Sequence, residues 1–109
     1  MTLTELHEIL KATGFPVAYS HFVESENSPL PDPPFICYLI TYSSNLSADD
    51  QVYKQVQNVQ IELYTDKKDL EAEAILEGIL NDNDLPFGTT ETYIESEALF
   101  QKIYEVRLL

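Results

Sequence analysis

The first apolar residues of the chain recur at the three- and four-residue intervals of a helix: Leu3, Leu6 and Leu10. This spacing puts them on one helical face. Thr2 and Glu5 have the spacing of a capping box, in which two side chains satisfy the first free amides of a helix. The pattern predicts a short helix that is ended by Gly14 and Pro16.

A second stretch, "NVQIELYTDKKDLEAEAILEGIL" at residues 58–80, turns from alternation to helical periodicity within a few residues. Its helical stripe consists of Ala72, Ile75, Leu76, Ile79 and Leu80. Asp69 is the predicted N-cap, and Glu71 and Glu73 fall in the first turn, where the helix dipole favours negative charge. We expect this helix to fold straight back over the sheet.

The other apolar positions alternate with polar ones or form short runs, and they predict five strands. The expected strands span residues 17–22, 35–42, 52–65, 87–95 and 98–109. The run at 35–42 is apolar on both alternations, which is typical of a strand covered on both faces or partly covered by a neighbouring subunit. The short turn at 96–97 predicts an antiparallel hairpin.

Two polar segments separate these elements. Residues 24–34 hold four of the chain's six prolines, which predicts an extended surface loop, and residues 43–51 are polar and turn-prone. The order α-β-β-β-α-β-β has no regular βαβ alternation, so we expect an α+β fold with a mainly antiparallel sheet and both helices on one face. A length of 109 residues is enough for one domain, residues 1–109.

The charge narrows the choice of partners. Nineteen acidic residues against six basic ones give a net charge of −13, which repels nucleic acid and anionic membranes. Three interpretations stay open: an acidic surface for solubility, a surface that DNA passes without binding, and a mimic of DNA that occupies the basic groove of an enzyme.

Candidate chemistry is sparse. Cys37 is the single cysteine, so no intramolecular disulfide is possible and a reducing compartment is expected. It lies mid-strand, where a small buried thiol is typical. His7 and His21 have no second ligand at metal-binding spacing; we expect His7 to be half-buried and His21 to be exposed. The sequence predicts no enzyme activity, no metal and no cofactor.

Targeting features are equally sparse. No apolar run approaches the ~20 residues that a membrane span requires. The N-terminal stretch "MTLTELHEIL" has no basic region followed by an apolar block. We therefore expect neither a membrane span nor a signal peptide.

Several segments from Phe35 onward occur in a familiar order. An apolar strand ends in Tyr42 and leads to "SSNLSADDQVY", followed by "QIELYTDKKD", an acidic amphipathic helix and "YIESEALFQKIYE". This part of the chain, roughly two-thirds of it, resembles a family of small virion proteins of tailed bacteriophages and prophages, the tail-completion, tail-terminator or head–tail joining proteins.

The resemblance implies a mixed α/β subunit that forms a ring, commonly a hexamer, at the head-proximal end of a long non-contractile tail. The implied partners are further copies of this chain, the tail-tube protein and the head–tail connector, with DNA passing through the lumen without specific binding. The implied location is the virion neck, after synthesis in the bacterial cytoplasm. No catalytic residues are implied.

Positions in the loops and turns supply the candidate contacts. We expect these residues to touch neighbouring subunits or to face the channel: Asp49, Asp50, Tyr53, Asp66, Lys67, Lys68 and Asp69. Tyrosines on or beside the strands are either partly buried core residues or interface residues. The alternative function is an acidic DNA mimic that inhibits a DNA-binding host enzyme.

Overall fold

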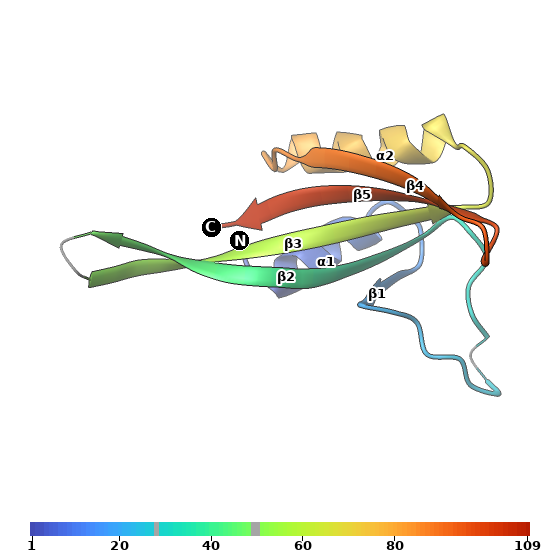
Figure 1. Cartoon of the computed structure of the whole chain (residues 1–109), viewed down its shortest axis with the longest axis horizontal. Helices are drawn as coiled ribbons and strands as arrows, with labels where there is room; N and C mark the ends of the chain where they lie inside the picture. Colours follow the sequence, from blue (N-terminus) through green and yellow to red (C-terminus); the bar gives the residue numbers. More distant parts are fainter. Residues whose placement is uncertain (28, 49–50) are drawn as a thin grey trace.

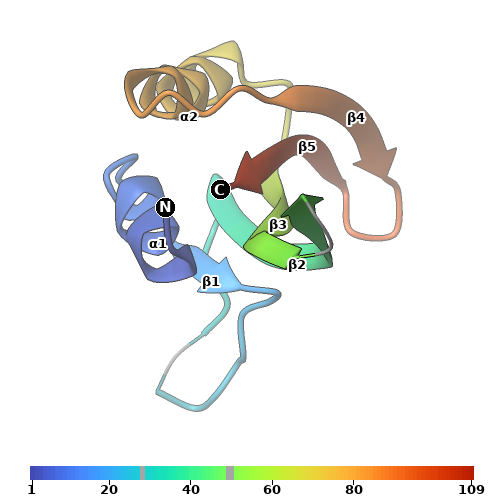
Figure 2. The ribbon, with the colours of Figure 1, turned by 90° about the vertical axis from the view of Figure 1, so that its left-hand side faces the viewer.

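The computed structural model describes residues 1–27, 29–48 and 51–109. Its elements follow the predicted order: α1 (Leu3–Lys11), β1 (Val17–Tyr19), β2 (Phe35–Ala48), β3 (Gln51–Thr65), α2 (Leu70–Asp82), β4 (Gly88–Ile94) and β5 (Leu99–Leu108). The strands form one sheet in the order β1-β2-β3-β5-β4. Both helices lie on the same side of this sheet (Figures 1 and 2), so the predicted α+β fold is confirmed.

Three of the four strand pairs are antiparallel, and β1 pairs with β2 in parallel. A parallel pair needs a long connection, and the proline-rich segment between Tyr19 and Phe35 provides it. The strand predicted at 17–22 is shorter than expected. It ends at Tyr19 because Ser20 has a φ of 68°, a left-handed conformation that interrupts an extended chain.

The start of α1 has the predicted capping box. The Thr2 hydroxyl accepts a hydrogen bond from the Glu5 amide at 3.1 Å, and the Glu5 carboxylate accepts one from the Thr2 amide at 3.2 Å. After the helix, Gly14 has a φ of 87°, which a residue without a Cβ adopts freely. The chain thereby turns into β1.

One core fills the space between the helices and the sheet. Tyr104 of β5 lies at its centre with no exposed surface; its hydroxyl donates to Glu77 at 2.8 Å. The buried residues around it come from both helices, three strands and the α2–β4 connection: Leu6, Leu10, Ile36, Tyr38, Val59, Ile61, Leu63, Ala72, Leu76, Leu80, Leu85, Val106 and Leu108. Each large side chain buried here contributes about 1.5–3 kcal/mol.

The apolar stripe predicted for α2 is partly wrong. Ile75 is 39% exposed, while Glu73 is 6% exposed and faces the sheet. Glu73 shares a face with Leu76 and Leu80, three and seven positions further on. Its carboxylate is tolerated there because the ammonium group of Lys102, on β5, lies 2.7 Å away.

The loop predicted at 43–51 is also wrong. β2 continues to Ala48 and β3 begins at Gln51, and the two strands stay paired over this region. β5 pairs with β3 only from Gln57 onward, so residues 44–48 and 51–56 form a two-stranded extension, here called the β2–β3 arm (Figure 1). Apolar and polar residues do not alternate in the arm, because neither of its faces packs against a helix. Its backbone groups nevertheless pair between the two strands.

Candidate functional site

The sheet face turned away from the helices, here called the open face, carries both apolar and hydrogen-bonding side chains. Strand register places these residues on it: Phe35, Cys37, Leu39, Asn58, Gln60, Glu62, Tyr64, Gln101, Ile103 and Glu105. Within residues 1–27, 29–48 and 51–109, neither helix packs on this face (Figure 2). Glu62 is nevertheless only 8% exposed.

Glu62 is buried by its neighbours in the sheet. Its Oε2 accepts hydrogen bonds from Gln101 at 2.7 Å and from Gln60 and the Tyr64 hydroxyl, both at 3.3 Å. The Gln101 amide also donates to the Tyr64 hydroxyl at 2.9 Å. These side chains come from β3 and β5, so the group, here called the Glu62 cluster, ties the two central strands together on the open face.

Burial determines the protonation of this cluster. It raises the pKa of Glu62, and the three hydrogen bonds oppose that shift. Burial and the nearby Glu62 charge raise the pKa of Cys37 to about 11 and that of Tyr64 to about 12. Cys37 is therefore a protonated thiol at neutral pH. A nucleophilic cysteine needs the opposite shift.

An apolar groove borders the Glu62 cluster. It measures about 490 Å³ and lies between the proline-rich connection and the ends of the strands. Its apolar lining includes Phe22, Leu30, Pro31, Phe35, Ile94 and Leu99. The rings of Phe22 and Phe35 meet edge to face at 5.5 Å, which holds the connection against β2.

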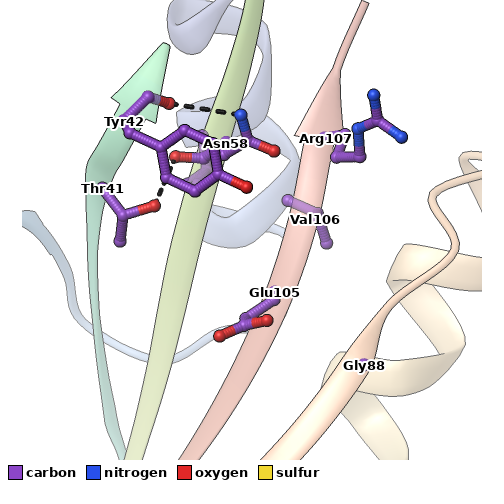
Figure 3. A pocket seen from close by; sticks show the side chains of 8 residues that line it. Thr41, Tyr42, Asn58, Gly88, Glu105, Val106 and Arg107 are labelled. Atoms are coloured by element: carbon purple, nitrogen blue, oxygen red, sulfur yellow. Dashed lines mark hydrogen bonds between the residues drawn. The ribbon is translucent and has the colours of Figure 1, made fainter. Parts of the chain in front are cut away.

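A second hollow, of about 240 Å³, lies at the base of the β2–β3 arm (Figure 3). The Thr41 hydroxyl donates to the Asn58 carbonyl at 3.0 Å, and the Asn58 amide donates to the Tyr42 carbonyl at 3.4 Å. Arg107, the chain's single arginine, lines the same hollow, and Tyr42 is 63% exposed. Tyrosine and arginine are both enriched at protein interfaces.

The structure separates the two predicted groups of contact residues. Asp49 and Asp50 lie outside the described residues. Tyr53 lies in the β2–β3 arm, where the strand register shifts and leaves it opposite no β2 residue. Asp66 follows the other end of β3 (Figure 1), after about 40 Å of strand at ~3.3 Å per residue. Tyr53 and Asp66 therefore belong to opposite ends of the molecule.

Two residues of the 66–69 turn have contacts within the chain. Asp69 caps α2, accepting a hydrogen bond from the Ala72 amide at 3.0 Å. Lys68 lies 2.8 Å from Glu73 and 2.7 Å from Glu91; these hydrogen bonds raise its pKa. Lys68 thus links α2 to β4, and Asp69 caps the start of α2; Asp66, Lys67 and Lys68 are all exposed.

The two histidines lie where the sequence predicted. His7 is half-buried and its Nδ1 is 2.8 Å from the Tyr38 hydroxyl, which joins α1 to β2; His21 is exposed. In the described part of the chain, no three His, Cys, Asp or Glu side chains are grouped as metal ligands would be. The described helices are too short or too polar to cross a membrane.

Sequence reasoning missed the Glu62 cluster. In the predicted strand 52–65, Gln60 and Glu62 alternate with Val59, Ile61 and Leu63 and therefore lie on the opposite face, as in the structure, but this alternation does not show that Glu62 is buried. A usable signal was the dense row of hydrogen-bonding residues on one face of β3, Gln60, Glu62 and Tyr64. Such a row can bury a carboxylate through side-chain contacts alone.

Comparison of the sequence with models of known protein families and with curated proteins gives no match.

Proposed function

We propose that this chain is a structural protein of a tailed-bacteriophage virion, a subunit that forms a ring at the head-proximal end of the tail tube and joins the tail to the head. The observation that carries the proposal is the β2–β3 arm, which extends beyond the rest of the sheet. A two-stranded ribbon alone is marginally stable in water. Contact with a neighbouring molecule supplies the packing that stabilises the arm.

The shape of the molecule supports assembly. The chain measures 50 × 31 × 26 Å, and the arm lies at one end of the long axis with the β3–α2 turn at the other (Figure 1). A ring is closed by one heterologous contact repeated around an axis. A subunit whose surfaces differ from one part to another is suited to such a head-to-tail contact.

The charge supports a channel function. With a net charge of −13, a ring of these subunits presents acidic walls, and DNA phosphates slide past such walls without binding. The proposed partners are the tail-tube protein and the head–tail connector, and the proposed location is the virion neck.

The DNA-mimic alternative receives less support from the same charges. A mimic must display its carboxylates to solvent, yet Glu62 and Glu73 are buried and Glu77 is bonded to Tyr104. No structural observation among the described residues favours it over the ring.

The experiment compares the assembly of the wild-type protein with that of variants at Tyr42, at the base of the arm. Wild-type protein is concentrated, measured by size-exclusion chromatography with light scattering, imaged by negative stain, and added to tubes polymerised from the tail-tube protein of the same genome. We expect rings, in solution or capping the tube ends. Tyr42→Asp should abolish them at an unchanged circular dichroism spectrum, whereas Tyr42→Phe should assemble normally.

Two outcomes contradict the proposal. One is a protein that stays monomeric at high concentration and also leaves the tube ends uncapped. The other is stoichiometric binding of the monomer to a DNA-binding enzyme that DNA competes away, which is the behaviour of a mimic.

A further inference from the structure

Two edges of the sheet, on opposite sides, are open to pairing. β1 pairs with the outer edge of β2 at Ile36–Tyr38, and the Tyr19 hydroxyl accepts a hydrogen bond from the Ile40 amide at 3.2 Å; no other described strand lies along that edge. At the other side of the sheet, β4 pairs with β5 along one edge, and its six residues Gly88–Tyr93 are all exposed. An unpaired edge presents a row of backbone donors and acceptors to any chain that can align with it.

Apart from the two register shifts of β2, after Ile40 and Leu46, and the single charge of β4, Glu91, neither edge carries the features that protect the edges of monomeric proteins. Such edges are blunted by charged residues, prolines, bulges or brevity. β2 spans fourteen residues and contains no charged residue and no proline, in a chain that is 23% charged. β4 contains one charge, Glu91, which is bound by Lys68 on the helix side. β1, by contrast, is three residues long.

The β2 edge has a regular section of suitable length. Its register with β3 shifts after Ile40 and again after Leu46, and between these shifts Tyr42–Leu46 pairs without interruption. β4 pairs without interruption over its seven residues, Gly88–Ile94. A run of five paired residues is an ordinary strand length, so the two edges match.

We propose that β4 of one copy adds to the outer edge of β2 at Tyr42–Leu46 of the next copy, so that the sheet continues from subunit to subunit. The occupant of each edge is a second copy of this chain. The two edges differ, so the contact is heterologous and propagates in one direction. This inference rests on the proposed ring and specifies the contact that builds it.

Engineered cysteines test the pairing of β4 with β2, because only cysteines on the same face of the continuous sheet can come close enough to form a disulfide. Tyr42 is opposite Asn58, and Thr90 and Thr92 are opposite Ile103 and Gln101, so all three face the open side. Thr89 is opposite Tyr104 and faces the helix side. Because side chains alternate across a strand, antiparallel pairing of β4 with β2, which keeps the open faces of successive copies on one side of the sheet, brings Tyr42 near Thr90 or Thr92 and not beside Thr89.

Within one chain these positions cannot be bridged. β2 and β4 are separated by β3 and β5, which is roughly 14 Å at ~4.8 Å per strand, and a disulfide needs Cα atoms within about 7 Å. Every disulfide in a double variant therefore joins two copies. Native Cys37 is buried, and wild-type protein serves as the blank.

The double variants Tyr42→Cys with Thr90→Cys, and Tyr42→Cys with Thr92→Cys, are oxidised under assembly conditions and separated on non-reducing gels. We expect a ladder of covalent multimers from at least one of them, about ten-fold stronger than from Tyr42→Cys with Thr89→Cys. The single variants, with spectra like the wild type, should remain uncross-linked.

The outcomes separate this contact from the proposed function. If rings form but no face-dependent ladder of disulfide-linked multimers appears, the pairing of β4 with β2 is refuted and the proposed ring function is not. A face-dependent ladder from open fibres supports the pairing and overturns the ring. Dimers from Tyr42→Cys alone show a self-complementary contact between like edges, which overturns the pairing as proposed.

Discussion

The ammonium group of Lys102 on β5 lies 2.7 Å from the carboxylate of Glu73 on α2. Lys102 is 19% exposed at its side chain and Glu73 8%. The second Glu73 oxygen is 2.8 Å from Lys68. Burial pushes the pKa of Glu73 up, but the hydrogen bonds and charges of Lys102 and Lys68 outweigh it and leave the pKa lowered. This ion pair is the polar fastening between α2 and the sheet.

Replacing Glu73 should therefore destabilise the fold. Glu73→Gln leaves two ammonium groups without their shared partner, so we expect the free energy of unfolding to fall by about 1–3 kcal/mol. Glu71→Gln is the matched control, since Glu71 is in the same first turn but exposed; its effect should stay within ~0.5 kcal/mol. Urea denaturation at pH 7 measures both, and equal effects would refute the role given to the pair.

The same pair predicts a loss of stability in acid. Because the folded pKa of Glu73 is below its ordinary value of 4.5, its contribution is complete above that pH and is lost as the pH falls through the folded value. The gap in unfolding free energy between wild type and Glu73→Gln should therefore narrow below pH 4.5. Denaturation curves from pH 7 to pH 3 measure the gap, and a constant gap would contradict the assignment.

Glu62 should behave in the opposite way. Its folded pKa is raised above 4.5, so the proton stabilises the fold below that pH, and this contribution is lost as the pH rises through the folded value. Glu62→Gln removes the titration, and its stability relative to wild type should increase between pH 4.5 and pH 8. Urea denaturation curves measured at intervals across this range give the difference in stability, and a difference that stays constant with pH would contradict the raised pKa of Glu62.

Cys37 should be almost unreactive in the folded protein. Burial and the charge of Glu62 raise its pKa to about 11, so labelling by a disulfide reagent at pH 8 should be slower than in the unfolded chain by roughly a hundred-fold or more. A Ser96→Cys variant supplies an exposed thiol in the β4–β5 turn as an internal standard. Comparable labelling of both thiols before unfolding would show that Cys37 is accessible.

Replacing either of the two apolar residues in the middle of α2 by alanine should lower the free energy of unfolding, but by different amounts. Leu76 has no exposed surface, whereas Ile75 is 39% exposed. Leu76→Ala should lower the free energy of unfolding by about 2–5 kcal/mol, while Ile75→Ala should cost less than about 1 kcal/mol, partly offset by the helix propensity of alanine. Thermal and urea denaturation of the two variants test the orientation of the helix directly.

Local signals accounted for much of the fold. The capping box at Thr2 and Glu5, the N-cap at Asp69 and the alternation of Val59, Ile61 and Leu63 predicted the elements and their core faces. They succeeded because each depends on residues close in sequence. The candidate contact residues are a different matter: the assignments of Asp66 and Lys67 remain predictions, and Lys68 and Asp69 have internal partners that sequence position alone does not show.

The amino-acid sequence by itself determined the order of elements, the α+β class and the acidic surface, because periodicity, caps and charge are properties of neighbouring residues. Tertiary structure decided what depends on distant partners. Glu73 became a buried residue because Lys102 lies across from it, Glu62 was covered because Gln101 reaches it from β5, and residues 43–48 became a strand because β3 pairs with them. Each of these outcomes is a contact between segments far apart in the chain, and no local pattern contains it.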